Sequence, residues 1–183
     1  MFLDVGEDEL KTTQEVFRRG CWYTRGVVFV HSAPRALCPH VQWMLEDVLK
    51  TEVHLEWGVQ KATPGVLRTE YSWVGPIGTG ALLASAMRGW ANLRYEITEE
   101  ATLGHDGARW SHTPDLGIFH AQMDVHGNIV VPENRIRAAL EAGDTEQMRR
   151  QLDLALGQAW DDELEPFRYA GADVSERWLH KFA

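Results

Sequence analysis

Apolar residues along the chain follow two spacings, one typical of strands and one typical of helices. The continuous apolar run over residues 27–30 predicts a central strand that is buried on both faces. After it, apolar residues at i, i+3, i+4, i+7 and i+8 predict an amphipathic helix over residues 39–50. The apolar stripe of this helix consists of Val41, Met44, Leu45, Val48 and Leu49.

Residues 53–60 and 66–74 instead alternate between apolar and polar side chains, which is the period of strands half buried in a sheet. The "ATPG" stretch between them predicts a turn, so the two strands form a hairpin. The alternation predicts that Val59 faces inward, with the other apolar residues of its strand, and that Gln60 faces the opposite side.

A second helix over residues 81–90 and a further strand over residues 92–98 complete this part of the pattern. In that strand we expect three inward side chains, those of Leu93, Tyr95 and Ile97. The order strand, helix, strand, strand, helix, strand is the βαββαβ order of the ferredoxin-like fold. Short connections and right-handed crossovers leave few other arrangements, so both helices are expected on one face of the sheet.

The other face of the sheet is predicted to carry charged side chains. These are Arg68, Glu70, Arg94 and Glu96. We expect this face to be either solvated or covered by a partly polar segment. As exposed cross-strand pairs, the charges would contribute under about 1 kcal/mol each.

The chain continues with more alternation over residues 108–131, where "HGN" predicts a tight hairpin turn. Pro132 then opens a helical region, and Asp144 caps a helix predicted over residues 145–165 that ends at Pro166. These late helices are the candidates to cover the charged face. The tail "VSERWLHKF" is expected either to dock as a short strand or to stay mobile.

The 183 residues are near the usual length of one domain, and a compact chain of this size needs no disulfide or metal to fold. We expect residues 1–22 to be a loosely attached arm, because they show no firm period, and residues 23–183 to be a single domain. The predicted fold class is α+β: a ferredoxin-like βαββαβ core with extra antiparallel strands and C-terminal helices.

The charge of the chain argues against two classes of binding partner. The net charge of −9 without a basic stripe argues against nucleic acid, whose binding depends on phosphate neutralisation, and against anionic membranes. No run approaches the roughly 20 apolar residues of a membrane span. The N-terminus lacks the features of a signal peptide, and the two cysteines, Cys21 and Cys38, form no disulfide framework. We therefore expect a cytoplasmic protein with free thiols.

Cys38 is the candidate nucleophile. In "LCPH" it would occupy the N-cap of the first helix with Pro39 at the first helical position, where backbone N–H groups and the helix dipole lower a thiol pKa. His40 or His31 would then serve as the base. The stretch locally resembles the active site of periplasmic disulfide oxidoreductases, but Val41 stands where their second cysteine would be, which excludes dithiol exchange. The alternative is a small, buried and inert cysteine.

The stretch "GPIGTG" is the candidate ligand site. It joins a strand to a helix, and glycine lets backbone amides approach an anion, so Gly78, Thr79 and Gly80 could bind a phosphate or carboxylate. It lacks the ending of a P-loop. The alternative is a tight turn in which Thr79 caps the helix.

Four histidines cluster between residues 105 and 126, at spacings that match no compact zinc signature. They are His105, His112, His120 and His126. A site built from His112, His120 and Asp124 is geometrically conceivable, but we expect neither a metal nor another cofactor.

Three stretches together resemble an actinobacterial family catalogued as domain of unknown function 3145. They are "GVVFVHSAP" followed by "CPHVQW", then "WVGPIGTGALLASAMRGW", then "LGQAWDDELEPFR". The resemblance covers about residues 25–180. It implies an actinobacterial cytoplasmic protein of one domain, with members encoded near type II fatty-acid synthesis genes in some genomes. It brings no activity, ligand or catalytic residue to carry over.

No set of catalytic residues and no cofactor fingerprint stands out, so the sequence favours a non-enzymatic binding or regulatory module. Its ligand would be a small anionic metabolite or a protein partner, with a link to fatty-acid metabolism suggested by the resemblance. The sequence leaves a homodimer open. The alternative is a thiol-dependent enzyme that uses Cys38 as nucleophile with His40 or His31 as base.

Overall fold

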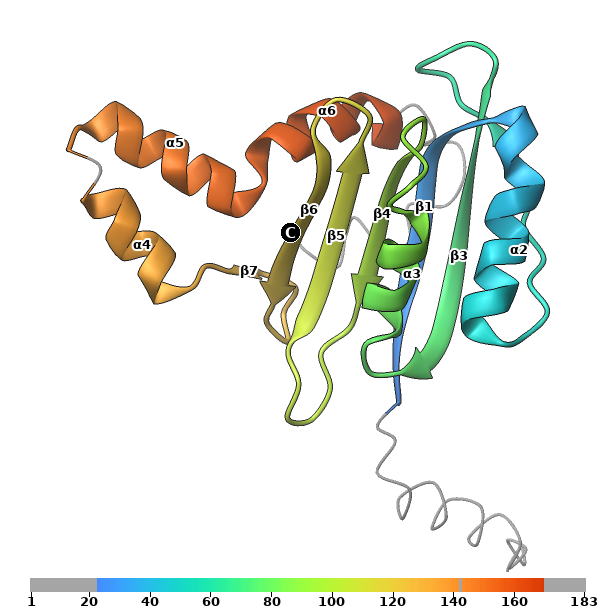
Figure 1. The fold of residues 1–183 in the computed structure, drawn as a ribbon, viewed down its shortest axis with the longest axis horizontal. Coiled ribbons are helices and arrows are strands. Elements are labelled where there is room, and N and C mark those ends of the chain that lie inside the picture. The colour runs from blue at the N-terminus through green and yellow to red at the C-terminus, as the bar shows by residue number, and fades with distance from the viewer. Residues whose placement is uncertain (1–22, 142, 170–183) are drawn as a thin grey trace, which may run out of the picture.

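The structure, a computed structural model, describes residues 23–169 except residue 142 and is a mixed α/β fold (Figure 1). A seven-stranded antiparallel sheet has the strand order β2-β3-β1-β4-β5-β6-β7. The strands are β1 Tyr23–Pro34, β2 Gly58–Val59, β3 Val66–Pro76, β4 Arg94–Glu99, β5 Gly107–Thr113, β6 Gly117–Met123 and β7 Ile129–Val130. The helices are α2 Cys38–Leu49, α3 Thr79–Met87, α4 Glu133–Leu140, α5 Thr145–Leu156 and α6 Gln158–Tyr169, with a 3-10 turn, η1 Arg35–Leu37, before α2.

The main core lies between the sheet and the helices α2 and α3. Figure 1 shows both helices on the same side of β1, β3 and β4. The helix stripe supplies Val41 and Leu45, both fully buried. The inward positions of residues 93–97 are fully buried as predicted, because alternate side chains of a strand point to one face. The expectations for the first helix, the second helix and β4 are therefore confirmed, with ends shifted by one to three residues.

The strand predicted over residues 53–60 is wrong in most of its length, because only Gly58 and Val59 pair with β3. The alternation also fails at its end, since Val59 is 69% exposed and Gln60 is 1% exposed. The side-chain amide of Gln60 donates to the carbonyl oxygens of His31 and Phe167, at 2.7 and 3.1 Å. These contacts with distant segments turn Gln60 inward and override the local period.

The long helix predicted over residues 145–165 is two helices, α5 and α6. Gly157 ends α5 in the left-handed region, with φ 78°, and a Cβ at this position would lie 2.5 Å from the Phe119 ring. Pro166, expected to end the helix, lies inside α6 instead. The chain turns at Gly157 because only glycine combines this backbone conformation with such close packing.

The second face of the sheet is covered in part by α6, which packs against β1 and β5 and buries Leu164. Helices α4 and α5 pack on each other and extend beyond the β7 edge of the sheet (Figure 1). They leave Leu140, Leu154 and Leu156 exposed. The expectation that late helices cover this face is confirmed for α6 and wrong for α4 and α5.

The expected arm over residues 1–22 and the tail over residues 174–182 lie outside the described residues. Among the helices between residues 23 and 169, none has the length and apolar character needed to cross a membrane.

Candidate functional site

The start of α3 binds an anion that the chain itself supplies. The backbone N–H groups of Gly78 and Gly80 donate to the two carboxylate oxygens of Glu99, each at 2.7 Å. Glu99 is the last residue of β4 and is buried. A carboxylate at a helix N-terminus satisfies free N–H groups and interacts favourably with the helix dipole. Glu99 therefore occupies the position in which the sequence predicted an external phosphate or carboxylate.

Thr79 does not cap α3, so that alternative is wrong. Gly78 is the N-cap, with φ 91°, and Thr79 is the first helical residue, with a hydroxyl that donates to the Pro76 carbonyl at 2.6 Å. A Cβ at Gly80 would lie 2.6 Å from the Trp110 ring. The glycine thus serves close packing of the helix start against the sheet, as well as the hydrogen bond to Glu99.

Cys38 is the first residue of α2, and Leu37 is the N-cap, so the predicted capping position is wrong by one residue. The thiol is buried and lies 3.7 Å from the carbonyl oxygen of Pro34. Burial raises the pKa of the Cys38 thiol, and the nearby charge of Arg35 opposes this shift without cancelling it. The shift is opposite to the one that activates a nucleophilic cysteine.

The two histidines proposed as bases for Cys38 have other partners. His31 Nε2 lies 2.7 Å from a carboxylate oxygen of Glu96. His40 is exposed, and its ring meets the Trp43 ring edge-on at 5.2 Å between centroids. The structure shows no hydrogen bond between Cys38 and either imidazole within residues 23–169.

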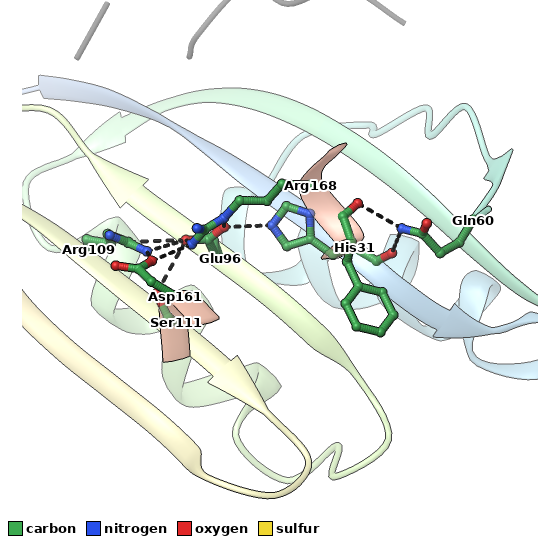
Figure 2. Close-up of polar contacts among 8 residues, drawn as sticks. His31, Gln60, Glu96, Arg109, Ser111, Asp161 and Arg168 are labelled. Atoms are coloured by element: carbon green, nitrogen blue, oxygen red, sulfur yellow. Dashed lines mark hydrogen bonds and ion pairs between the residues drawn. The ribbon is translucent and has the colours of Figure 1, made fainter. Parts of the chain in front are cut away.

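The most concentrated polar site is a buried cluster around Glu96 (Figure 2). One carboxylate oxygen of Glu96 accepts hydrogen bonds from Arg109 at 2.7 Å and from Arg168 at 2.6 Å. The other accepts from Arg168 Nε and contacts His31, both at 2.7 Å. Asp161 accepts from both arginines as well. The cluster therefore joins β1, β4, β5 and α6.

Paired charges stabilise the ionised form of Glu96. Burial alone would raise the pKa of its carboxyl, but hydrogen bonds and the opposite charges of His31 and Arg168 outweigh it, so the pKa lies well below the ordinary value. The carboxylate is 3% exposed and the Arg168 side chain 13% exposed. The cluster fixes α6 on the sheet, with Glu96 at its buried end and Asp161, whose side chain is 30% exposed, at its outer end.

The sequence pattern placed Glu96 correctly on the face opposite α2 and α3 but gave no sign of its partners. The bonded arginines are 13 and 72 residues away along the chain. Arg94, expected to pair across strands, instead contacts Glu163 of α6 at 3.0 Å and lies over the Phe167 ring. The charged face is thus covered by a partly polar helix at Arg94 and Glu96, whereas Glu70 is exposed, so each of the two alternatives stated above holds for part of the face.

The histidines of the second half of the chain do not gather. His112 is buried and bonds to the Leu93 carbonyl at 2.9 Å, while His120 stacks on Trp110. In the part of the chain that the structure describes, no three His, Cys, Asp or Glu side chains are close enough to hold a metal ion.

A cleft of about 520 Å³ lies between β6 and the helices that follow β7. Its apolar lining includes Phe119, Leu154 and Trp160, and its polar lining includes His120 and Arg135. The Trp160 indole donates to the Gly117 carbonyl at 2.9 Å, and its ring contacts Phe119, so α6 is fixed at one side of the cleft. This volume lies within the range of roughly 300–1,000 Å³ typical of ligand sites.

The described residues thus form a mixed α/β fold with a charge cluster around Glu96 and a cleft of apolar and polar lining beside β6. The chain belongs to the family described as "Protein of unknown function (DUF3145)", which matches residues 27–181. Neither the curated proteins nor the solved structures gave a significant match.

Proposed function

We propose that this protein is a non-enzymatic binding module whose ligand surface is the cleft between β6 and the helices α4 to α6. The observation that carries the proposal is the combination of apolar and polar groups along this cleft. Apolar side chains there, such as Leu154 at 49% exposed and Val130 at 40% exposed, are left uncovered by the described chain. A surface of this kind marks a ligand or partner site more often than a scattered exposed leucine does.

The polar groups of the cleft favour a ligand that carries a negative charge. The Arg135 side chain lines the cleft and forms no ion pair with any residue that the structure describes. By contrast, Arg137 on the same helix bonds to Glu133 at 2.5 Å. An apolar ligand with an anionic group would therefore find both complementary surfaces.

This proposal moves the ligand site away from Gly78, Thr79 and Gly80. An external anion at these amides would have to displace Glu99, which already makes two short hydrogen bonds there. The cleft needs no such displacement.

We also propose a specific topology for the first part of the fold. The order β2-β3-β1-β4, with α2 between β1 and β2 and α3 between β3 and β4, supports a ferredoxin-like arrangement for the first four strands. Strands β5 to β7 and helices α4 to α6 would then be additions that create the cleft. We also keep the proposal of one domain over residues 23–183.

An anionic aromatic dye, anilinonaphthalene sulfonate, tests the cleft directly. The dye is titrated into the native full-length protein and into Leu154→Asp, which places a charge on the apolar wall. Leu103→Asp is the matched control, because Leu103 is 82% exposed in the turn before β5. We expect Leu154→Asp to weaken dye binding at least tenfold and Leu103→Asp to leave it unchanged. Equal binding by all three proteins, or no binding to the native protein, would contradict the proposal.

A further inference from the structure

The outer edge of β6 is open along most of its length. On its inner side, β6 pairs with β5 from Gly117 to Met123. On its outer side, β7 pairs only with Gln122 and Met123. Residues 117–121 therefore form a strand edge that no other described strand covers.

The backbone groups of Ile118 and His120 point out of this edge. In an antiparallel sheet, successive residues direct their N–H and C=O groups to opposite sides. The N–H of Asp124 donates outward, to the Asn128 carbonyl at 2.9 Å, so the even-numbered residues of β6 face outward. Within the described residues, no turn, loop or side chain gives Ile118 or His120 a backbone hydrogen bond on this side.

The reason that β7 stops short is visible in its sequence. The register Gln122↔Val130 would place Pro132 opposite His120. Proline has no N–H to donate to the ladder, and here it is the N-cap of α4, so the chain turns away from β6. The cleft begins where β7 ends, with Pro132 in its lining.

The size of the opening fits one extended chain. Five edge residues span about 15 Å at the strand rise of about 3.3 Å per residue. Leu154 of α5 lines the cleft, and Trp160 of α6 contacts β6 itself, through Gly117 and Phe119, at one side of it. A single strand could bond to Ile118 and His120 and place alternate side chains into the cleft.

We propose that β6 accepts an extended segment of a partner protein as an added strand, with apolar side chains in the cleft and an acidic side chain beside Arg135. This inference rests on the proposed function of the cleft and specifies its ligand. Main-chain hydrogen bonds to Ile118 and His120 would provide affinity, and the cleft and Arg135 would provide selectivity. Charge complementarity favours an acidic segment, since Arg135 has no partner among the described residues.

The test uses the full chain and peptides selected from a displayed library of random sequences. A matched pair of variants separates the contribution of the His120 backbone N–H to peptide binding from that of its side chain. His120→Ala removes the exposed imidazole and keeps the N–H, whereas His120→Pro removes both. Proline is tolerated at edge positions whose N–H faces outward. We expect His120→Pro to weaken binding of the selected peptide at least tenfold relative to His120→Ala, because one peptide carbonyl loses its donor.

Two further measurements keep the test decisive if His120→Pro does not fold. Peptide binding is expected to slow hydrogen exchange at the amides of Ile118 and His120 at least tenfold. Arg135→Glu is expected to weaken binding at least tenfold, whereas the control Arg137→Glu, whose arginine is paired with Glu133, leaves it unchanged.

The outcomes distinguish this inference from the proposed function. If dye binding depends on Leu154 but no selected peptide protects Ile118 or His120, strand addition is overturned and the cleft remains a site for small ligands. If neither dye nor peptide responds to changes in the cleft, both proposals fail. If the native protein is a dimer that His120→Pro dissociates, a second copy occupies the edge and the partner segment is overturned.

Discussion

Glu96 and Glu99 lie on the same strand, β4, and point to opposite faces of the sheet. Glu96 accepts hydrogen bonds from Arg109 of β5 and Arg168 of α6, while Glu99 accepts from N–H groups at the start of α3. Both carboxylates are buried, and both oxygens of each accept hydrogen bonds from the chain itself. At the scale of single residues, burial with a partner for each oxygen favours a structural role for these groups.

Replacing Glu96 by Gln tests the charge cluster. The change removes the buried one of the two carboxylates that Arg109 and Arg168 share, the other being Asp161, so we expect the free energy of unfolding at neutral pH to fall by about 3–5 kcal/mol. Urea unfolding measures it. The exposed Glu100→Gln, which removes a surface pair with Arg25, is the control and should cost under about 1 kcal/mol.

The pH dependence of the free energy of unfolding, compared between the native protein and Glu96→Gln, gives an independent check. Since the pKa of Glu96 is lowered in the folded state, the unfolded chain binds its proton first as pH falls below the ordinary value of 4.5. This contribution to stability is thus present above pH 4.5 and is lost as pH falls toward the folded pKa. Glu96→Gln should lack this part of the acid sensitivity, and an unchanged slope in the variant would contradict the assignment.

A further prediction concerns the reactivity of the Cys38 thiol. Because burial raises the pKa of its thiol, we expect alkylation of native Cys38 to be slow at neutral pH and fast after unfolding in urea. Mass spectrometry of the labelled peptide measures the rate at Cys38 separately from Cys21. Rapid labelling of the native protein, with an apparent pKa below that of a free thiol, would restore the thiol-dependent enzyme.

At the scale of elements, the apolar periods were sufficient to predict α2, α3, β3 and β4, because each buries one face against a large core. They failed where distant contacts decide the local conformation. Gln60 turns inward to bond to His31 and Phe167, and Gly157 ends α5 against the ring of Phe119. The anion at the start of α3 was predictable as chemistry, but its source on β4 depends on a tertiary contact.

The packing of α3 on the sheet makes Gly80→Ala a sensitive substitution. Its Cβ would lie 2.6 Å from the Trp110 ring and 2.8 Å from a carboxylate oxygen of Glu99. We expect it to lower the free energy of unfolding by about 1–3 kcal/mol, the usual cost of overpacking. Gly89→Ala is the control, since no atom lies within 4 Å of its Cβ position, and thermal unfolding compares the two. Equal effects would show that the helix start is not tightly packed.

At the scale of the whole molecule, the sheet ends in a two-residue strand at each of its two edges. The short β2 covers part of β3, and the short β7 covers part of β6. Pro132 signals in the sequence that a strand must end, but the register that sets it opposite His120 emerges only from the assembled sheet. For this reason we predicted the ligand site at the glycine-rich helix start and did not identify the cleft beside β6 from the sequence.

Hydrogen exchange in the free protein tests the open edge of β6 most directly. By the alternation of the ladder, the amides of Phe119 and Ala121 bond to β5, whereas those of Ile118 and His120 face the cleft. We predict that the amides of Ile118 and His120 exchange at least tenfold faster than those of Phe119 and Ala121 under native conditions. Equal protection of all four amides would mean that the edge is already occupied, and would contradict it.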